Sequence, residues 1–415
     1  MRIITLILAF CLLFVSSLSS YVKGDYALNV IYELSDKKYM GRQAGTLENR
    51  DAINFLSSEL VKINVSNYFL QDFPVEVYDL KDMPEFTIKY NQEIRKFKYR
   101  EDFRDRFSGS WKVEAPIEVD VKNIKDNFWL TDYRNGVTKS QVVASIYSAK
   151  GVILGVPKDM TELIFEKSMF FQISNLPVIY ISSQVFQSIE DLLDKNQKVI
   201  GYYRIEYDKR LEKAYNLIFY VPSKVKNDRV LLISAHVDHV GKDPDNTFFP
   251  GANDNASGVG VLMEIAKLIL EKGNNYPFNI LFLITNAEEK GLLGAKYFAE
   301  NSPIPLNNIF LNINLDCVGR GKFLTVGYNT YAEKYVKKLR VSANFVKDYY
   351  LSDSDQYIFH LLGIPVLFFI RSDSGGYIPD LHQKTDTREK IPRENLVETI
   401  DLFFSILDDM TLKFF

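Results

Sequence analysis

Downstream of Tyr215, short apolar runs alternate with segments of helical periodicity. We expect strands at residues 230–235, 279–285, 309–315 and 366–370, and helices at 258–270 and 292–299. Strands that alternate with helices in this way predict an α/β fold, with a mostly parallel mixed sheet flanked by helices. In such sheets ligands bind beyond the carboxyl ends of the strands, so the residues that follow each run are the first candidates for chemistry.

The upstream pattern divides into two parts. Residues 26–63 have helical spacing, and Thr46 is a candidate cap for a helix over 49–60. Between residues 75 and 210, β-prone runs are separated by polar turns, which predicts a β-rich inserted domain. Its expected strands are 86–90, 117–121, 141–147, 151–154, 177–181 and 199–207, with a short helix at 190–194. The α/β domain then consists of residues 25–74 and 211–415.

The first 24 residues have the layout of a secretory signal peptide. Arg2 precedes an apolar run over residues 3–15, and small polar residues follow at 16–20. The run is shorter than the roughly 20 residues that cross a bilayer, although an uncleaved anchor is the alternative. We therefore expect an exported protein, periplasmic or secreted, with no stable membrane span after cleavage. Cleavage removes Cys11 and leaves Cys317 as the one thiol, so no internal disulfide is expected.

Composition adds little to the prediction of fold and function. A chain of 415 residues is long enough for two domains, and its 47% hydrophobic content is that of a globular protein. The net charge is −3, with acidic and basic residues interspersed. This lacks the basic footprint of a nucleic-acid-binding protein, so we expect no nucleic-acid partner. The oligomeric state stays open.

Candidate chemistry follows the predicted strands. His236 comes directly after the run 230–235, Glu288 and Glu289 come shortly after 279–285, and Asp316 follows 309–315. If these strands are parallel, their carboxyl ends meet at one edge of the sheet. Two further residues can approach that edge: Asp254, in a segment of small residues before a predicted helix, and His382, in a loop after 366–370.

A mixture of imidazole and carboxylate ligands suits zinc. One aspartate can bridge two ions, and an unliganded carboxylate must still move the proton of the attacking water. The pair Glu288 and Glu289 can serve both tasks, and Asp238 can fix the tautomer of His236. Each residue alone is more often structural, but their joint placement in a chain with four histidines favours a metal site. His239 is expected at the rim of this site or behind its ligands, and His360 has no expected role.

Six segments, in order, resemble the zinc aminopeptidases of peptidase family M28. They are SAHVDHVG, GANDNASGVGVLMEIAK, NAEEKGLLGAKYF, NINLDCVG, SDQYIFHLLGIP and YIPDLHQKTDT, and an N-terminal GRQAGT resembles the opening of the same family. The inserted segment more weakly resembles a protease-associated domain, through residues 151–155 and 176–181. The resemblance implies two Zn²⁺ ions, one on His236 and Asp316 and the other on Glu289 and His382, with Asp254 as the bridge.

The same resemblance implies further roles. Glu288 is the expected general base and then general acid, and Asp238 the residue that orients His236. Tyr377 lies where some relatives line the substrate pocket, and Tyr350 or Tyr349 can hydrogen-bond an oxyanion. The expected function is hydrolysis of peptide bonds in peptides or proteins, with release of N-terminal residues. The alternatives are a carboxypeptidase or dipeptidase, a one-zinc glutaminyl cyclase, and a non-catalytic binding protein of the same fold.

Overall fold

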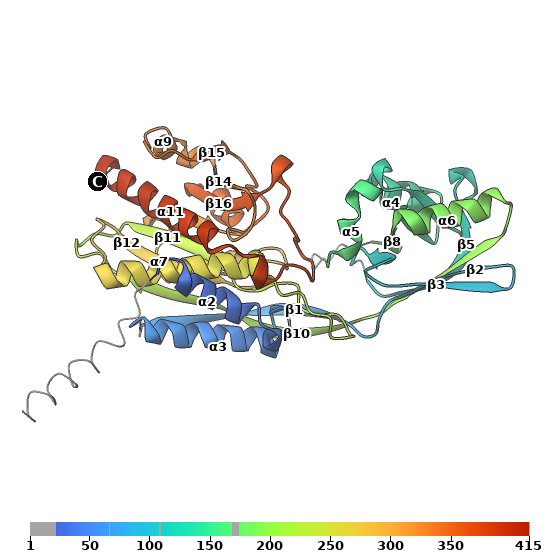
Figure 1. Cartoon of the computed structure of the whole chain (residues 1–415), viewed down its shortest axis with the longest axis horizontal. Coiled ribbons are helices and arrows are strands. Elements are labelled where there is room, and N and C mark those ends of the chain that lie inside the picture. The colour runs from blue at the N-terminus through green and yellow to red at the C-terminus, as the bar shows by residue number, and fades with distance from the viewer. Residues whose placement is uncertain (1–21, 66, 108, 168–173, 415) are drawn as a thin grey trace, which may run out of the picture.

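The computed structural model describes residues 22–65, 67–107, 109–167 and 174–414. Most of the predicted signal peptide, including Cys11, lies outside the described residues. Figure 1 shows two lobes, each built on its own sheet and joined by two long paired strands, β1 and β10. In the part of the chain that the structure describes, no helix combines the length and the apolar character that a membrane crossing requires.

The larger lobe contains an eight-stranded sheet in the order β1-β10-β12-β11-β13-β16-β14-β15. Its central strands β12, β11, β13 and β16 are parallel neighbours, while β1 and β10 add an antiparallel edge. The predicted fold class, a mostly parallel mixed sheet flanked by helices, is confirmed. The strand bounds are β1 Tyr68–Leu80, β10 Tyr207–Val221, β11 Val230–His236, β12 Asn279–Thr285, β13 Ile309–Leu315, β14 Phe323–Tyr328, β15 Asn344–Lys347 and β16 Val366–Ser372.

Helices cover both faces of this sheet because its central strands are apolar on both sides. Leu231 and Ile233 of β11 pack into one core with α2, α3, α7 and α11, whereas Leu232 packs into a second core with α8 and α10. Thr46 caps α3 as predicted, since its side chain accepts a hydrogen bond from the Asn49 amide. The helix bounds are α2 Asp25–Leu34, α3 Leu47–Lys62, α7 Gly258–Lys272, α8 Leu293–Glu300, α9 Glu333–Val336, α10 Gln356–Leu361 and α11 Arg393–Phe414.

The smaller lobe has a second eight-stranded sheet in the order β3-β2-β9-β5-β6-β7-β8-β4, with its own apolar core. Its strands are β2 Glu85–Tyr90, β3 Glu93–Phe97, β4 Phe103–Asp105, β5 Trp111–Glu118, β6 Phe128–Asp132, β7 Gly151–Gly155, β8 Val178–Ile181 and β9 Val199–Ile205. Its helices are α4 Val137–Ile146, α5 Glu162–Phe165 and α6 Ser183–Asp194.

The strand predicted at residues 141–147 is wrong, because this segment forms most of α4. Val142 and Val143 favour a strand by propensity, but burial follows the spacing of a helix. Ser140 and Ala144, four residues apart, are the buried positions of α4, while Val142 is 53% exposed.

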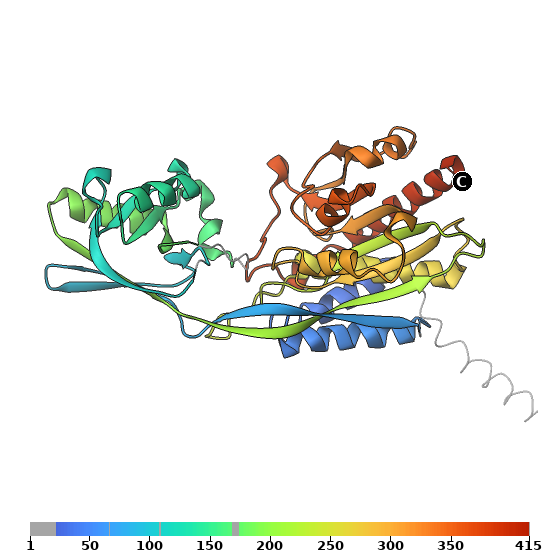
Figure 2. The same ribbon diagram turned by 180° about the vertical axis from the view of Figure 1, so that it is seen from behind.

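The lobes are joined by an antiparallel ribbon. Figure 2 shows β1 and β10 running from one lobe toward the other without a break. The predicted domain boundaries at residues 74/75 and 210/211 fall inside these two strands, where Pro74 pairs with Lys213 and Val77 with Arg210. A boundary inside a continuous strand pair leaves no flexible linker in the sequence.

Candidate active site

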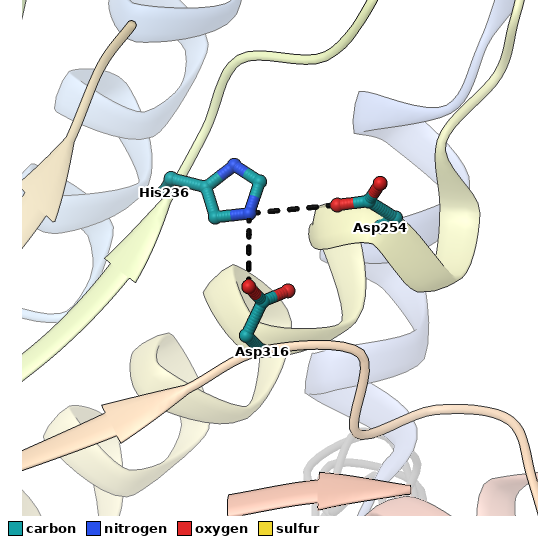
Figure 3. A group of neighbouring side chains, drawn as sticks. All are labelled: His236, Asp254 and Asp316. Carbon is teal, nitrogen blue, oxygen red and sulfur yellow. Dashed lines mark ion pairs between the residues drawn. The ribbon is translucent and has the colours of Figure 1, made fainter. Parts of the chain in front are cut away.

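The first group of candidate ligands lies at the carboxyl ends of two parallel strands and in a turn beside them. His236 ends β11, Asp316 follows β13, and Asp254 reaches the same edge from the irregular turn η5 (Ala252–Ser257) before α7. His236 Nε2 lies 3.4 Å from Asp254 Oδ1 and 3.3 Å from Asp316 Oδ2, and all three side chains point toward one another (Figure 3). All three residues are buried.

A second group faces the other oxygen of Asp254. His382 Nε2 lies 3.2 Å from Asp254 Oδ2 and 3.0 Å from Glu289 Oε2. His239 also belongs to this group, because its Nδ1 lies 3.0 Å from Glu289 Oε1 and 3.5 Å from Asp254 Oδ2. The two histidines differ in access: His239 is buried, whereas His382 lines the active-site cavity. Asp254 thus lies between two sets of imidazole and carboxylate groups.

Hydrogen bonds between side chains and backbone groups fix the turn that carries Asp254. Asp386 accepts from the amide of Asn253 (2.9 Å) and from that of Asp254 (3.0 Å). Asn253 Oδ1 accepts from the amides of Gly319 and Arg320 after β13, and Asn255 Nδ2 donates to the Leu315 carbonyl. The turn is therefore fastened to the segment that carries Asp316. Asp386 was not among the predicted site residues, although it lies in one of the motifs.

Asp238 and the two glutamates form a second layer. The Asp238 carboxylate accepts from the amides of Glu288 (3.0 Å) and Glu289 (3.3 Å). Its nearest oxygen lies 3.8 Å from His236 Nδ1, while the carbonyl oxygen of Asp238 lies 3.2 Å from that nitrogen. The expected contact to His236 is thus made by the backbone carbonyl, because the carboxylate holds the glutamate loop. Burial raises the pKa of Asp238 to about 6.

Buried Asp355 was also missed by the sequence analysis. It accepts a hydrogen bond from Thr285 Oγ1 at the end of β12, and burial raises its pKa to about 7. Burial, followed by the charges of Glu289, Asp355 and Asp316, raises the pKa of Glu288 well above its ordinary value.

A cavity of about 670 Å³ opens onto these groups. Apolar side chains form much of its wall, and Glu288 and Tyr350 also line it. Tyr350 donates its hydroxyl proton to the carbonyl of Gly376, and Tyr349 OH lies 3.1 Å from Ser372 Oγ. Tyr377 is 46% exposed and is not part of the cavity lining that the described residues form. The apolar wall residues include Leu292, Ile358, Leu361, Phe368, Ile370, Ile378 and Leu381.

The donor set fits zinc. Imidazole nitrogens and carboxylate oxygens are ordinary zinc ligands. Within the described ranges, no lysine or arginine forms an ion pair with Asp254, Glu289 or Asp316, so cationic side chains do not neutralise these buried carboxylates. Burial alone would lower the pKa of His236, but Asp316, Glu288 and Asp254 outweigh it and raise this pKa well above its ordinary value. The same uncompensated negative charge favours a divalent cation, which would displace the imidazole proton because a histidine ligand is neutral.

Residues 216–407 match the sequence model of peptidase family M28. This part of the chain belongs to peptidase family M28. The resemblance drawn from the motifs is thereby confirmed. Aminopeptidase YwaD of Bacillus subtilis (strain 168) is 30% identical over 200 residues, which are 44% of this chain and 41% of that protein. The chain thus matches less than half of the length of this relative.

Solved structures share the fold over nearly the whole chain. A peptidase M28 precursor from Shewanella amazonensis SB2B is 19% identical, with a TM-score of 0.74 and coverage of 93% of each chain. BSAP, a zinc aminopeptidase from Bacillus subtilis, is 22% identical, with a TM-score of 0.67 over 92% of this chain and 94% of that chain. These matches extend beyond the M28 domain and therefore include the second sheet.

The N-terminal motif GRQAGT lies outside the matched region and contacts the M28 domain through Arg42. The guanidinium of Arg42 is completely buried and donates to four backbone carbonyls, those of Leu34, Val237, Pro250 and Gly251, at 2.6–2.9 Å. Two of these acceptors flank the site, since Val237 follows His236 and Gly251 precedes η5. Arg42 is a supporting residue that the sequence analysis did not single out.

The inserted module also reaches the loop that carries His382. The amide of Lys167 donates to the His382 carbonyl at 3.0 Å. Close by, Arg100 contacts both oxygens of Asp243 at 2.6 and 3.2 Å, and Lys167 Nζ lies 3.4 Å from Asp243 Oδ1. Asp243 belongs to the M28 domain, while Arg100 and Lys167 belong to the insertion. One candidate ligand is thus positioned partly by the second lobe.

Proposed function

We propose that the chain is an exported two-zinc aminopeptidase that releases N-terminal residues from peptides. The observation that carries this proposal is the position of Asp254. Its Oδ1 faces His236, which also contacts Asp316, and its Oδ2 faces His382, which also contacts Glu289. An aspartate whose two oxygens face two such sets has the arrangement of a bridge between two ions.

One zinc would be held by His236, Asp316 and Asp254, and the other by Glu289, His382 and Asp254. Bound zinc supplies Lewis acidity, which polarises the scissile carbonyl and acidifies water. A ring nitrogen of each histidine faces both carboxylates, and His382 is proposed as the ligand rather than His239 because His382 borders the cavity, whereas His239 is buried. His239, hydrogen-bonded to Glu289, orients that carboxylate.

Glu288 moves the proton. It lines the cavity and, within the described residues, takes part in no ion pair, so its carboxylate is available to the attacking water. It accepts the proton of the water and delivers it to the leaving amine. Asp238 fixes the Glu288 backbone through the amide hydrogen bond, and Tyr350 forms part of the wall that contacts the substrate.

The name of the related aminopeptidase from Bacillus subtilis supports cleavage at the N-terminus. The apolar wall of the cavity suits an apolar N-terminal side chain, because its burial contributes about 1.5–3 kcal/mol. Export is supported by the signal-like first 24 residues.

The test combines metal analysis with activity. Purified protein should contain two zinc ions per chain and release the N-terminal residue from leucyl reporter substrates, and a chelator should abolish release until zinc is restored. One zinc together with cyclisation of N-terminal glutamine would favour a glutaminyl cyclase. Release of C-terminal residues would favour a carboxypeptidase, and no metal and no turnover would favour a binding protein.

A further inference from the structure

A second cavity, of about 290 Å³, shares His382 with the active-site cavity. The rest of its lining comes from the inserted module and includes two guanidinium groups. These lining residues are Arg104, Arg106, Tyr133, Val137, Glu166 and Tyr180. A basic cavity beside a proposed zinc ligand is suited to bind an anionic part of the substrate.

Arg104 is held in place and is 93% buried, since its exposed fraction is 7%. Its guanidinium lies over the Tyr180 ring at 4.4 Å, and its Nη2 lies 3.4 Å from Glu166 Oε2. Its Nε is buried and has no hydrogen-bond partner among the residues that the structure describes. A buried donor of this kind is costly unless an acceptor arrives, which an anionic ligand provides.

Arg106 adds a charge that no carboxylate balances. Its Nη1 donates to the neutral amide oxygen of Gln141, and no ion pair involves it within the described ranges. The cavity therefore contains two guanidinium groups and one carboxyl group, that of Glu166. Burial raises the pKa of Glu166, although Arg104 opposes this effect.

We propose that this cavity binds a carboxylate of the peptide on the leaving side of the scissile bond. The inference rests on the proposed aminopeptidase function. If the N-terminal residue occupies the larger cavity, the next residues cross His382 toward the arginines. Because the two cavities share His382, the carboxylate belongs to one of the first residues after the cleaved bond. It is either the C-terminal carboxylate of a short peptide or an acidic side chain.

Two pairs of peptides separate these sources. Leucyl-glycyl-glycine and leucyl-glycyl-glycinamide differ only in the terminal carboxylate, while leucyl-aspartyl-glycinamide and leucyl-asparaginyl-glycinamide differ only in the side chain. We expect the charged member of at least one pair to have a kcat/KM about tenfold higher, mainly through KM, as a charge-assisted hydrogen bond predicts. A preference in the first pair identifies the C-terminus, and one in the second pair identifies the side chain. Ratios near one in both pairs would overturn the proposal.

Three variants test the residues. In Arg106→Gln the preference should fall toward one, whereas in Glu166→Gln it should rise, because the competing carboxyl is removed. In Arg134→Gln, which removes an exposed guanidinium paired with Asp159 on the same module, the ratio should stay at the wild-type value. A role of Arg106 in folding alone would lower all rates together and would leave the ratio unchanged, which would overturn the assignment.

Binding to zinc-loaded Glu288→Gln protein, measured by calorimetry, separates this proposal from the function on which it rests. If the charged peptide bound more tightly but the wild type cleaved neither peptide, the proposed aminopeptidase function would be wrong and the carboxylate subsite would be supported. If the wild type cleaved all four peptides and both members of each pair bound with equal affinity, the aminopeptidase function would be supported and the carboxylate subsite would be wrong.

Discussion

Glu288 and Glu289 are adjacent, yet their surroundings differ. Each oxygen of Glu289 faces a histidine, His239 or His382, at 3.0 Å. Burial alone would raise the pKa of Glu289, but the two histidines outweigh it and lower the pKa to about 2. The pKa of Glu288 is shifted in the opposite direction by burial and neighbouring carboxylates. The pair therefore divides into one carboxylate among proton donors and one among carboxylates, which matches a ligand and a general base.

This division predicts opposite outcomes for two variants. Glu288→Gln should lower kcat by about 10²–10⁴-fold, the usual contribution of a general acid–base group, while the zinc content stays unchanged. Glu289→Gln should lose zinc, because an amide is a poorer ligand than a carboxylate. Metal analysis and steady-state kinetics on both proteins check this. Near-normal kcat in the first variant would contradict the assignment of the base.

The candidate ligands could be predicted because each lies at or after an apolar strand or in a turn of small residues. The residues that hold these ligands in place could not be predicted. Asp386 and Asp238 act by accepting backbone amide protons, and any polar residue in a loop has that capacity. The expected carboxylate contact of Asp238 to His236 followed from spacing alone, which does not reveal that the Glu288 and Glu289 amides take the same carboxylate.

At the scale of elements, Arg42 joins three segments that the sheet leaves apart. Its four acceptors lie at the end of α2, after β11 and before η5. All four acceptor residues are buried, and only the Gly251 carbonyl has a further donor among the described residues, the Ala256 amide, so removal of Arg42 leaves the carbonyls of Leu34, Val237 and Pro250 unpaired. Unpaired buried polar groups cost about 1–3 kcal/mol each.

Arg42→Met should therefore lower the free energy of unfolding by about 3 kcal/mol or more, within the range of the most damaging single substitutions. Thermal or denaturant unfolding of the zinc-loaded protein measures the change. Arg50→Met on α3 is the matched control, because Arg50 is exposed and contacts Tyr215 at the surface. Its effect should stay within about 0.5 kcal/mol. Equal effects for both variants would show that Arg42 does not hold these segments.

Elements with strong periodicity were predicted best. The strands at 279–285 and 309–315 agree with β12 and β13 at both ends, because buried parallel strands are continuous apolar runs. The edge strand β3 escaped prediction because its residues are mostly exposed and no apolar alternation marks it. The error at 141–147 arose where two valines outweighed the spacing of the small buried residues of α4.

For the whole molecule, the position of the second lobe is fixed by more than the β1–β10 ribbon. Arg100 and Lys167 of the insertion surround Asp243 of the M28 domain, and these side chains are only 12%, 10% and 2% exposed. Because the Lys167 amide also binds the His382 carbonyl, this cluster connects lobe position with a proposed zinc ligand. The sequence could not indicate this contact, since its partners lie 143 residues apart in the case of Arg100 and Asp243.

Asp243→Asn should loosen this joint, because it leaves two buried cations without a counter-ion, a loss of about 3–5 kcal/mol for a broken buried pair. We expect lower thermal stability and weaker zinc binding in a competition assay, whereas exposed Asp245→Asn should change neither by more than about 0.5 kcal/mol. If Asp243→Asn bound zinc with wild-type affinity, the position of the second lobe would not influence zinc binding at the proposed site.

The difference in unfolding free energy between the wild type and Asp243→Asn should change with pH in a defined direction. Burial alone would raise the pKa of Asp243, but Arg100 and Lys167 outweigh it and lower the pKa below its ordinary value. A carboxyl with a lowered pKa in the folded state stabilises the fold above its unfolded pKa, near 3.9, and this stabilisation is lost as pH falls toward the folded pKa. The gap in unfolding free energy between wild type and Asp243→Asn should thus be constant at neutral pH and shrink below about pH 4. A gap that instead grew on acidification would assign the stabilisation to a different group.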